Sequence, residues 1–140
     1  MKKIKVMLVD DQVLLREGLK TIINLQKDME VIVEAGNGKE AVKKVDEYEI
    51  DVILMDIRMP ELNGVEATYQ IKERYKDISI IMLTTFDDDD YIVEALVNGA
   101  EGYLLKDIDG PHLVQFIREA YNGEMLLPTR IASKLATRIT

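Results

Sequence analysis

The sequence contains no cysteine among its 140 residues, which excludes a disulfide framework and a metal site built from thiolates. No apolar run approaches the roughly 20 consecutive residues that a membrane-spanning helix needs. The first five residues carry three lysines and lack the apolar stretch of a signal peptide. These absences predict a cytoplasmic chain that has no membrane partner.

Positive charge is also in short supply. The chain has 18 lysine and arginine residues against 26 aspartate and glutamate residues, so its net charge is -8. Such an excess of negative charge disfavours direct binding to free nucleic acid. Hydrophobic residues make up 47% of the chain, which is enough for the core of one globular domain.

Short apolar runs alternate with amphipathic stretches along the chain. Five runs have the composition of β-strands: residues 4–9, 30–34, 50–56, 78–83 and 101–105. Each precedes a stretch with helical spacing of its apolar residues, as in Leu15, Leu19 and Ile22. Five βα units in a row predict an α/β fold with a parallel sheet and right-handed crossovers. Charged residues flank the second run, which places it at one edge of the sheet.

Polar side chains stand where four of these strands end. They are Asp10 and Asp11 after the first strand, Asp56 at the end of the third, Thr84 after the fourth and Lys106 after the fifth. Parallel strands present their carboxyl ends at one edge of a sheet, so these side chains should converge there. Three crowded carboxylates repel one another unless a cation joins them, and an oxygen-only ligand set suits Mg²⁺. The pattern therefore predicts a magnesium site.

Asp56 is the candidate nucleophile of this site, because aspartate carboxylates form acyl phosphates. Lys106 would neutralise the oxygens of a phosphoryl group in transfer, and the hydroxyl of Thr84 would donate one hydrogen bond to it. Taken alone, Asp56 is equally well explained as a structural cap of the turn that follows. The residues at the other strand ends favour the chemical role.

Five short motifs resemble those of the receiver domains of two-component response regulators. In order they are Val9-Asp10-Asp11, Met55-Asp56-Ile57-Arg58-Met59-Pro60, Asn63-Gly64, Leu83-Thr84 and Tyr103-Leu104-Leu105-Lys106. The resemblance covers about residues 4–122. It implies a flavodoxin-like (βα)5 fold, which is a doubly wound parallel sheet with the strand order 2-1-3-4-5.

The resemblance implies that the chain is a phosphorylation-dependent signalling switch and not an enzyme. Asp56 would accept a phosphoryl group from a sensor histidine kinase, and Lys106 would pair with that group. Asp11, Asp56 and the backbone carbonyl of Arg58 would bind Mg²⁺. Asp10 would hold a water molecule bound to the metal ion.

Thr84 and Tyr103 would form the switch that responds to phosphorylation. Movement of Thr84 towards the phosphoryl group would vacate space beneath the fourth helix for Tyr103, and the repacked surface would favour a homodimer. Tyr103 is alternatively a plain aromatic residue of an edge strand. Residues 91–97 of the fourth helix are apolar on almost every side, which fits either deep burial or a docking surface.

Within the family the sequence is most similar to the NarL/LuxR-type branch, through residues 83–86 and 102–107 and through Gly123-Glu124. That branch continues into a helix-turn-helix domain that binds DNA, and this chain ends at Thr140. We therefore expect a receiver domain over residues 1–122 and a linker over residues 123–140, with DNA bound only through an absent C-terminal domain. The alternative is a stand-alone receiver that acts by protein binding or in a phosphorelay.

Residues 128–139 have the spacing of an amphipathic helix. An apolar stripe and a cationic stripe run side by side, formed by Ile131, Leu135 and Ile139 and by Arg130, Lys134 and Arg138. Pro128 suits the first position of such a helix. The linker is accordingly predicted to be helical, and a frayed tail is the alternative.

Two other function classes fit the sequence less well. Phosphatases of the haloacid-dehalogenase type also use an aspartate nucleophile and Mg²⁺, but they need a second aspartate two residues later, where this chain has Arg58. A pseudo-receiver, which binds partners without phosphorylation, would lack one of the acids or the lysine. None of them is missing here.

Three local patterns have plain structural interpretations. The four acids of residues 87–90 suit the start of a helix, where the helix dipole favours negative charge. His112, the one histidine, should be exposed to solvent. Asp107 follows Lys106 at a position where most receivers have a proline in a cis bond, so we expect a trans bond there.

Overall fold

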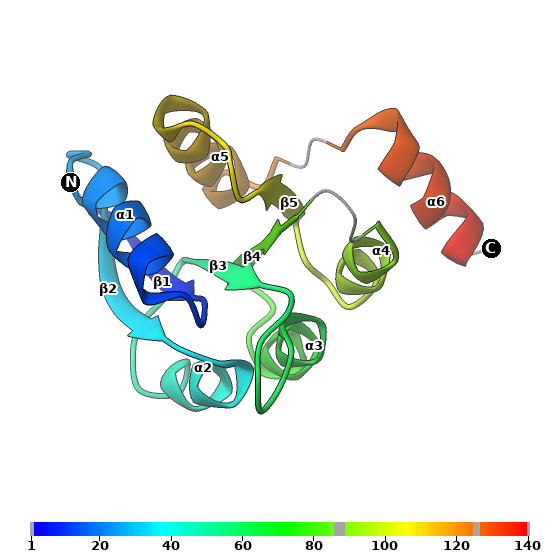
Figure 1. Ribbon diagram of the computed structural model, residues 1–140, viewed down its shortest axis with the longest axis horizontal. Coiled ribbons are helices and arrows are strands. Elements are labelled where there is room, and N and C mark those ends of the chain that lie inside the picture. The colour runs from blue at the N-terminus through cyan, green and yellow to red at the C-terminus, as the bar shows by residue number, and fades with distance from the viewer. Residues whose placement is uncertain (1, 86–88, 125–126, 140) are drawn as a thin grey trace.

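The computed structural model describes residues 2–85, 89–124 and 127–139, in which strands and helices alternate (Figure 1). The elements are β1 (Ile4–Val9), α1 (Val13–Asn24), β2 (Met29–Ala35), α2 (Gly38–Lys44), β3 (Val52–Asp56), α3 (Gly64–Arg74), β4 (Ser79–Thr84), α4 (Asp89–Val97), β5 (Gly102–Leu105), α5 (Gly110–Tyr121) and α6 (Thr129–Ile139). The succession confirms the five βα units that the apolar runs predicted.

The strands form one parallel sheet in the order β2-β1-β3-β4-β5, which is the order that the family resemblance predicted. β2 lies at one edge, as the charges around it predicted, and β5 lies at the other. The strand bounds agree with the sequence interpretation to within two residues, since the third run begins at Val52 and the last at Gly102. All carboxyl ends therefore meet at one edge of the sheet.

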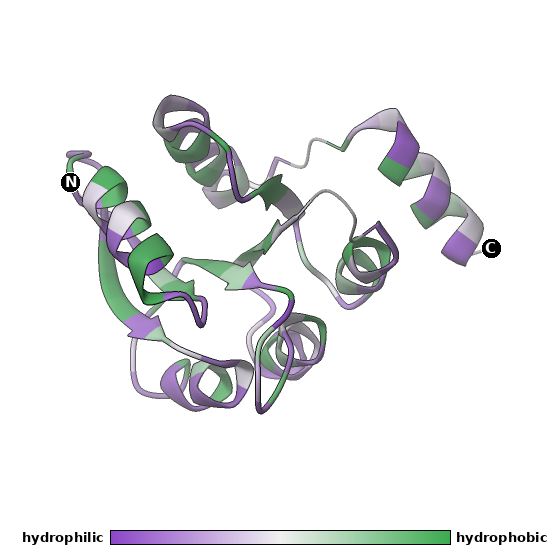
Figure 2. Ribbon diagram, viewed as in Figure 1, coloured by the Kyte–Doolittle hydropathy of each residue, from purple (hydrophilic) through white to green (hydrophobic). Residues whose placement is uncertain are grey.

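Helices cover both faces of the sheet (Figure 1). α1 and α5 pack on one face, with Leu19 and Ile117 among their buried residues. α2, α3 and α4 pack on the other, with Ile71 and Ile92 among theirs. Hydrophobic residues dominate the strands in Figure 2, and every residue of β3 is buried. A strand covered on both faces needs a continuous apolar run, and this explains why β3 was easy to recognise in the sequence.

The loop after β3 returns tightly to the end of that strand. The N–H of Gly64 donates a hydrogen bond to the carbonyl of Ile57 at 2.8 Å. A Cβ atom on residue 64 would lie 2.0 Å from the carbonyl oxygen of Asp56, so only glycine fits there. The Asn63 side chain accepts a hydrogen bond from the N–H of Glu66 at 2.9 Å and caps α3. These contacts hold the start of α3 against the end of β3.

α6 is the amphipathic helix that the sequence predicted, and it lies beside α4 (Figure 1). Ile131 is fully buried and Leu135 is partly buried on its apolar side, while its basic residues form ion pairs with acids of α4. Residues 129–139 thus form a docked helix and not a frayed tail. Their function as a linker stays a prediction.

Four of the nine residues of α4 are deeply buried, which accounts for part of its apolar sequence, and a docking surface on its exposed residues stays a prediction. Its buried residues are Ile92, Val93, Ala95 and Leu96. Ile131 of α6 belongs to the same hydrophobic cluster as Ile92 and Leu96, so α6 completes the packing around α4.

The local predictions that the structure tests are confirmed. The side chain of His112 is 77% exposed, and the described peptide bonds, including the one between Lys106 and Asp107, are all trans. Asp89 and Asp90 lie in the first turn of α4 as expected, whereas Asp87 and Asp88 lie outside the described residues. Within the described ranges, no helix combines the length and the apolar character needed to cross a membrane.

Candidate metal site at the carboxyl end of the sheet

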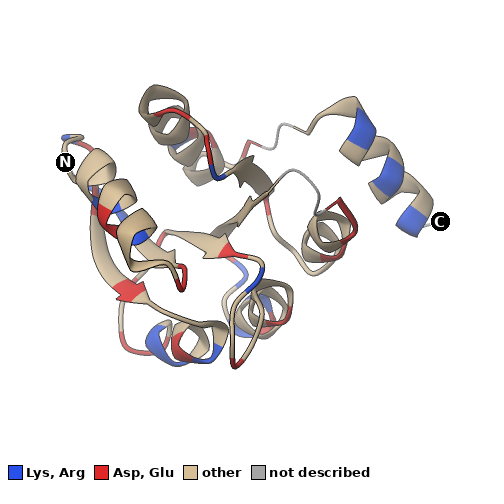
Figure 3. Cartoon of the chain, viewed as in Figure 1, with Lys and Arg blue, Asp and Glu red and all other residues tan. Residues whose placement is uncertain are grey.

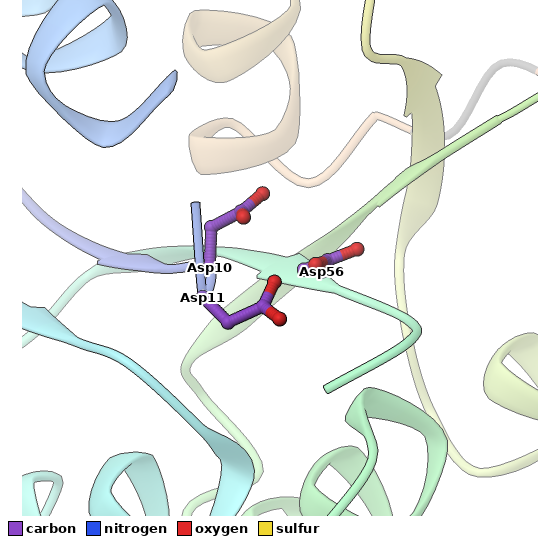
Figure 4. Close-up of side chains that lie close together, drawn as sticks. All are labelled: Asp10, Asp11 and Asp56. Atoms are coloured by element: carbon purple, nitrogen blue, oxygen red, sulfur yellow. The ribbon is translucent and has the colours of Figure 1, made fainter. Parts of the chain in front are cut away.

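Asp10, Asp11 and Asp56 meet at the carboxyl ends of β1 and β3 (Figure 4). β1 and β3 are neighbours, and their register pairs Val9 with Met55. The next residues, Asp10 and Asp56, therefore lie at the same level along the two strands. One carboxylate oxygen of each aspartate lies within 4.8 Å of the others. The predicted convergence of the three acids is therefore present in the structure.

The three acids differ in their access to solvent. Asp10, directly after β1, is fully buried, and Asp56, the last residue of β3, is 3% exposed, because helices cover both faces of the sheet. Asp11 is exposed and borders a cavity of about 380 Å³ together with Arg58 and Tyr91. The site thus has a buried floor formed by Asp10 and Asp56 and opens to solvent on the side of Asp11.

Lys106 supplies the positive charge of this floor. It follows β5, and its Nζ atom lies 3.0 Å from Oδ1 of Asp56 and 3.3 Å from Oδ2 of Asp10. The ammonium group also donates a hydrogen bond to the side-chain oxygen of Gln12 at 3.4 Å. One cation therefore faces two buried carboxylates, and the site keeps an excess of negative charge.

The pKa values of Asp56 and Lys106 reflect this crowding of charges. Burial, together with the charge of Asp10, raises the pKa of Asp56 to about 6, although the hydrogen bond and charge of Lys106 act in the opposite direction. Burial lowers the pKa of the Lys106 ammonium, but the hydrogen bond and charge of Asp56 outweigh it, so the net shift of that pKa is upward. The positive charge of Lys106 thus compensates only in part for the burial of Asp56 and for the negative charge around it.

Two oxygens in this floor lack hydrogen-bond partners among the described residues. They are Oδ2 of Asp10, which has only the 3.3 Å charge contact with Lys106, and Oδ2 of Asp56. A buried polar atom without a partner is unfavourable, and a cation bound between the acids would relieve both. Hard carboxylate oxygens with solvent access on one side fit Mg²⁺, which keeps several water ligands. The residues therefore fit the predicted metal ion.

Thr84 ends β4 beside this floor and is 1% exposed. The strand register pairs Asp56 with Leu83, so Thr84 lies one residue beyond the nucleophile candidate on the neighbouring strand. Its hydroxyl donates a hydrogen bond to the carbonyl of Thr85 at 2.9 Å. Thr84 and Lys106 also line a cavity of about 230 Å³. Thr84 therefore stands at the site, as predicted, and its hydroxyl donates a hydrogen bond to the backbone.

Tyr103 lies apart from the acids. It is a half-buried residue of the edge strand β5 and borders an apolar cavity of about 600 Å³ with Leu127 and Pro128. Burial raises the pKa of the Tyr103 hydroxyl, and the nearby charges of Arg130 and Asp89 act on it in opposite directions. The predicted switch residue therefore lines the same cavity as the segment that leads into α6.

Gln12 and Arg16 hold Asp10 in place, and the sequence interpretation missed both. The N–H of Gln12 donates a hydrogen bond to Oδ1 of Asp10 at 2.8 Å, and its side chain accepts one from Lys106. The Arg16 guanidinium donates to the carbonyl of Asp10 and forms an ion pair with Glu34 of β2 at 3.2 Å. The four-residue spacing of Gln12 and Arg16 at the start of α1 places them on one helix face, which is the signal that could have revealed them.

Comparisons with known proteins agree with this geometry. The family model of the response regulator receiver domain matches residues 6–118. The chain is 43% identical over 132 residues to the transcriptional regulatory protein LnrK of Bacillus subtilis, an overlap of 94% of this chain and 60% of LnrK. It spans about three-fifths of the length of the curated relatives that it matches.

Two solved structures have the same fold. A LuxR-family two-component response regulator from Aurantimonas sp. SI85-9A1 superposes with a TM-score of 0.85 at 30% identity, over 99% of this chain and 100% of the other. The receiver domain of the putative response regulator NarL from Mycobacterium tuberculosis has a TM-score of 0.83 at 28% identity, over 89% of this chain and 100% of the other.

Proposed function

The chain belongs to the response regulator receiver domain family, and from this we propose that Asp56 accepts a phosphoryl group from a sensor histidine kinase. Domains of this family are signalling domains and not enzymes of the usual kind. The observation that carries the proposal is the position of Asp56, which is buried beside two other acids and lies 3.0 Å from the ammonium group of Lys106.

The two oxygens of Asp56 have different partners, and this suits them to different tasks. Oδ1 faces Lys106, whereas Oδ2 has no hydrogen-bond partner among the described residues. In the transfer, an oxygen of Asp56 forms a bond to phosphorus while the bond between phosphorus and the donor histidine nitrogen breaks, and that nitrogen keeps the electron pair. Lys106 stabilises the negative charge on the phosphoryl oxygens.

Asp11, Asp56 and the backbone carbonyl of Arg58 would hold Mg²⁺, and Asp10 would accept a hydrogen bond from one of its water ligands. When bound, the ion neutralises the carboxylates and orients the phosphoryl oxygens. Gln12 and Arg16 would keep Asp10 fixed during the transfer through the contacts described above.

Thr84 and Tyr103 would pass the change on to the surface. A phosphoryl group on Asp56 adds negative charge and acceptor oxygens next to Thr84, and its hydroxyl would exchange the Thr85 carbonyl for one of them. Tyr103 would then turn inward from its present position in the cavity that it lines with Leu127 and Pro128. We propose that this rearrangement controls transcription through dimerisation or through a DNA-binding domain, as the regulators related to this chain suggest.

Labelling with acetyl phosphate and Mg²⁺ tests the proposal. We expect one phosphoryl group per chain, no labelling of Asp56→Asn, and weaker labelling of Asp11→Asn that more Mg²⁺ partly restores, because Asp56 is the acceptor and Asp11 only a metal ligand. Asp77→Asn, a change at an exposed loop position, is the matched control and should label like the wild type. Stoichiometric labelling of another carboxylate in Asp56→Asn would contradict the assignment.

A further inference from the structure

The cationic stripe of α6 is fully engaged with α4. Arg130 donates hydrogen bonds to the two oxygens of Asp89 at 3.0 and 2.9 Å, and Lys134 donates to the same carboxylate at 3.2 Å. One turn further, Arg138 donates to Glu94 at 2.6 and 3.3 Å. Figure 3 shows these basic residues along α6 beside the acids of α4. The three basic residues recur every fourth position, so one side of α6 follows α4 along its length.

Apolar packing adds to this charge pairing. Ile131 is 0% exposed, although it belongs to the last described helix of the chain, and it packs in the cluster that contains Ile92 and Leu96 of α4. Leu135, one turn later, packs against the same cluster. Exposed ion pairs alone hold two helices together only weakly, but a fully buried isoleucine fixes the position of α6.

Tyr103 lies near the beginning of this docked helix. It lines the cavity of about 600 Å³ together with Leu127 and Pro128, the residues that lead into α6. The charges of Arg130 and Asp89, which pair with each other, also reach its hydroxyl. Tyr103, Leu127 and Leu135 all pack against the hydrophobic cluster that contains Ile131, so the positions of Tyr103 and of α6 depend on each other.

We propose that α6 is a latch that stabilises the unphosphorylated state of the receiver, so that docking of α6 on α4 and binding of a phosphoryl group at Asp56 oppose each other. This inference rests on the proposed function of Asp56. If Tyr103 turns inward, its ring leaves the cavity that it lines with Leu127 and Pro128, and its hydroxyl moves away from the ion pair of Asp89 and Arg130. Coupling between two sites is reciprocal, so releasing α6 must also favour the phosphoryl group.

Variants at the interface between α6 and α4 test the latch without changing the site. Ile131→Asn places a polar group in the buried cluster and should release α6. Glu94→Arg opposes Arg138, and the charge swap Glu94→Arg with Arg138→Glu should restore the ion pair. We expect Ile131→Asn to bind beryllofluoride with Mg²⁺ about fivefold more tightly than the wild type, at the lower end of typical coupling between sites. Glu94→Arg should also tighten the binding of beryllofluoride, and the double variant with Arg138→Glu should restore the wild-type affinity.

The absence of native cysteine permits a direct measurement of the position of α6. Spin labels at Glu73→Cys on α3 and Ala136→Cys on α6, both exposed positions, report the distance between these helices in the full chain. Beryllofluoride should lengthen or broaden that distance distribution in the same direction as Ile131→Asn does.

Two outcomes overturn the inference in different ways. Equal beryllofluoride affinity in all variants, with an unchanged distance distribution on binding, would show that α6 is docked but not coupled to the site. Failure of every variant, including the wild type, to bind beryllofluoride would refute the proposed phosphoacceptor function and the coupling with it.

Discussion

Nζ of Lys106 lies 3.0 Å from Oδ1 of Asp56 and 3.3 Å from Oδ2 of Asp10, so a single ammonium group is shared by two buried carboxylates. Gln12 holds two of these groups, because its side chain accepts a hydrogen bond from Lys106 and its N–H donates one to Asp10. The site therefore places its positive charge where a phosphoryl group on Asp56 would develop negative charge, before any donor arrives.

The first prediction is that Lys106→Ala slows labelling by acetyl phosphate by roughly 100-fold, which is the usual loss when one charge-stabilising donor is removed from a buried site. Lys106→Arg keeps the positive charge but replaces the compact ammonium group with a planar guanidinium group, so it should recover part of the labelling rate. Initial labelling rates at saturating Mg²⁺ measure both effects. A rate that is the same in Lys106→Ala as in the wild type would remove Lys106 from the transfer step.

The acids and the lysine could be predicted because parallel strands impose one geometric rule. Each strand end in a parallel sheet lies at the same edge, so the order of apolar runs in the sequence already brings Asp10, Asp56 and Lys106 together. The partners that orient these groups were harder to foresee. Arg16 reaches the carbonyl of Asp10 from a helix face and pairs with Glu34 on another strand, and no short motif encodes such a contact.

The docking of α6 shows the same limit on a larger scale. Its two stripes were visible in the sequence, since apolar residues recur at positions 131, 135 and 139 and basic residues at positions 130, 134 and 138. Which surface receives the helix depends on the path of the chain after α5, and the acids that it meets, Asp89 and Glu94, lie on an element far away in the sequence. Periodicity predicts a helix and its faces, but it does not predict the partner.

The second prediction concerns the tight approach at the end of β3. Gly64→Ala would place a Cβ atom 2.0 Å from the carbonyl oxygen of Asp56 and should destabilise the fold by about 2 kcal/mol or more. Apart from its chain neighbours and the backbone of its own helix, a methyl group on residue 18, in the middle of α1, would meet no atom of the described residues within 4 Å. Gly18→Ala should therefore stabilise the fold by about 0.5–1 kcal/mol. Urea denaturation measures both, and two changes of the same sign would contradict the packing argument.

The third prediction is a pH dependence of stability. Arg118 of α5 bonds the carboxylate of Asp28 at 2.7 and 3.0 Å and holds the pKa of Asp28 below its usual value. The unfolded chain therefore binds the proton more readily than the folded one does. The pair contributes stability above the unfolded pKa of about 3.9, and this contribution is lost as the pH falls through the lower pKa of the folded state.

Both side chains of this pair are about one-third exposed to solvent, so the expected contribution at pH 7 is below about 1 kcal/mol. At neutral pH the free energy of unfolding of Asp28→Asn should be lower than that of the wild type by less than about 1 kcal/mol. In strong acid the two free energies should become equal. Arg118→Gln should show the same convergence, because it removes the other partner. Parallel pH profiles for wild type and Asp28→Asn would show that the ion pair has no net effect.

The last prediction is that a phosphoryl mimic strengthens self-association, because a signalling domain must pass its signal through a surface. Coupling of roughly 1–3 kcal/mol would tighten dimerisation by about 5–150-fold. Sedimentation across a concentration series, with and without beryllofluoride and Mg²⁺, measures the change, and Thr84→Ala should uncouple it by removing the hydroxyl that responds to the phosphoryl group.

The location of α6 makes this prediction more specific. α6 covers part of α4, so a dimer that uses the covered part of α4 can form only after α6 leaves. In that case Ile131→Asn should self-associate more strongly than the wild type even without beryllofluoride. Stronger association with the mimic but no effect of Ile131→Asn would place the dimer interface on another face, such as the one formed by α1 and α5. An association constant that beryllofluoride leaves unchanged would exclude dimerisation as the output, and the signal would then have to pass to another domain or partner.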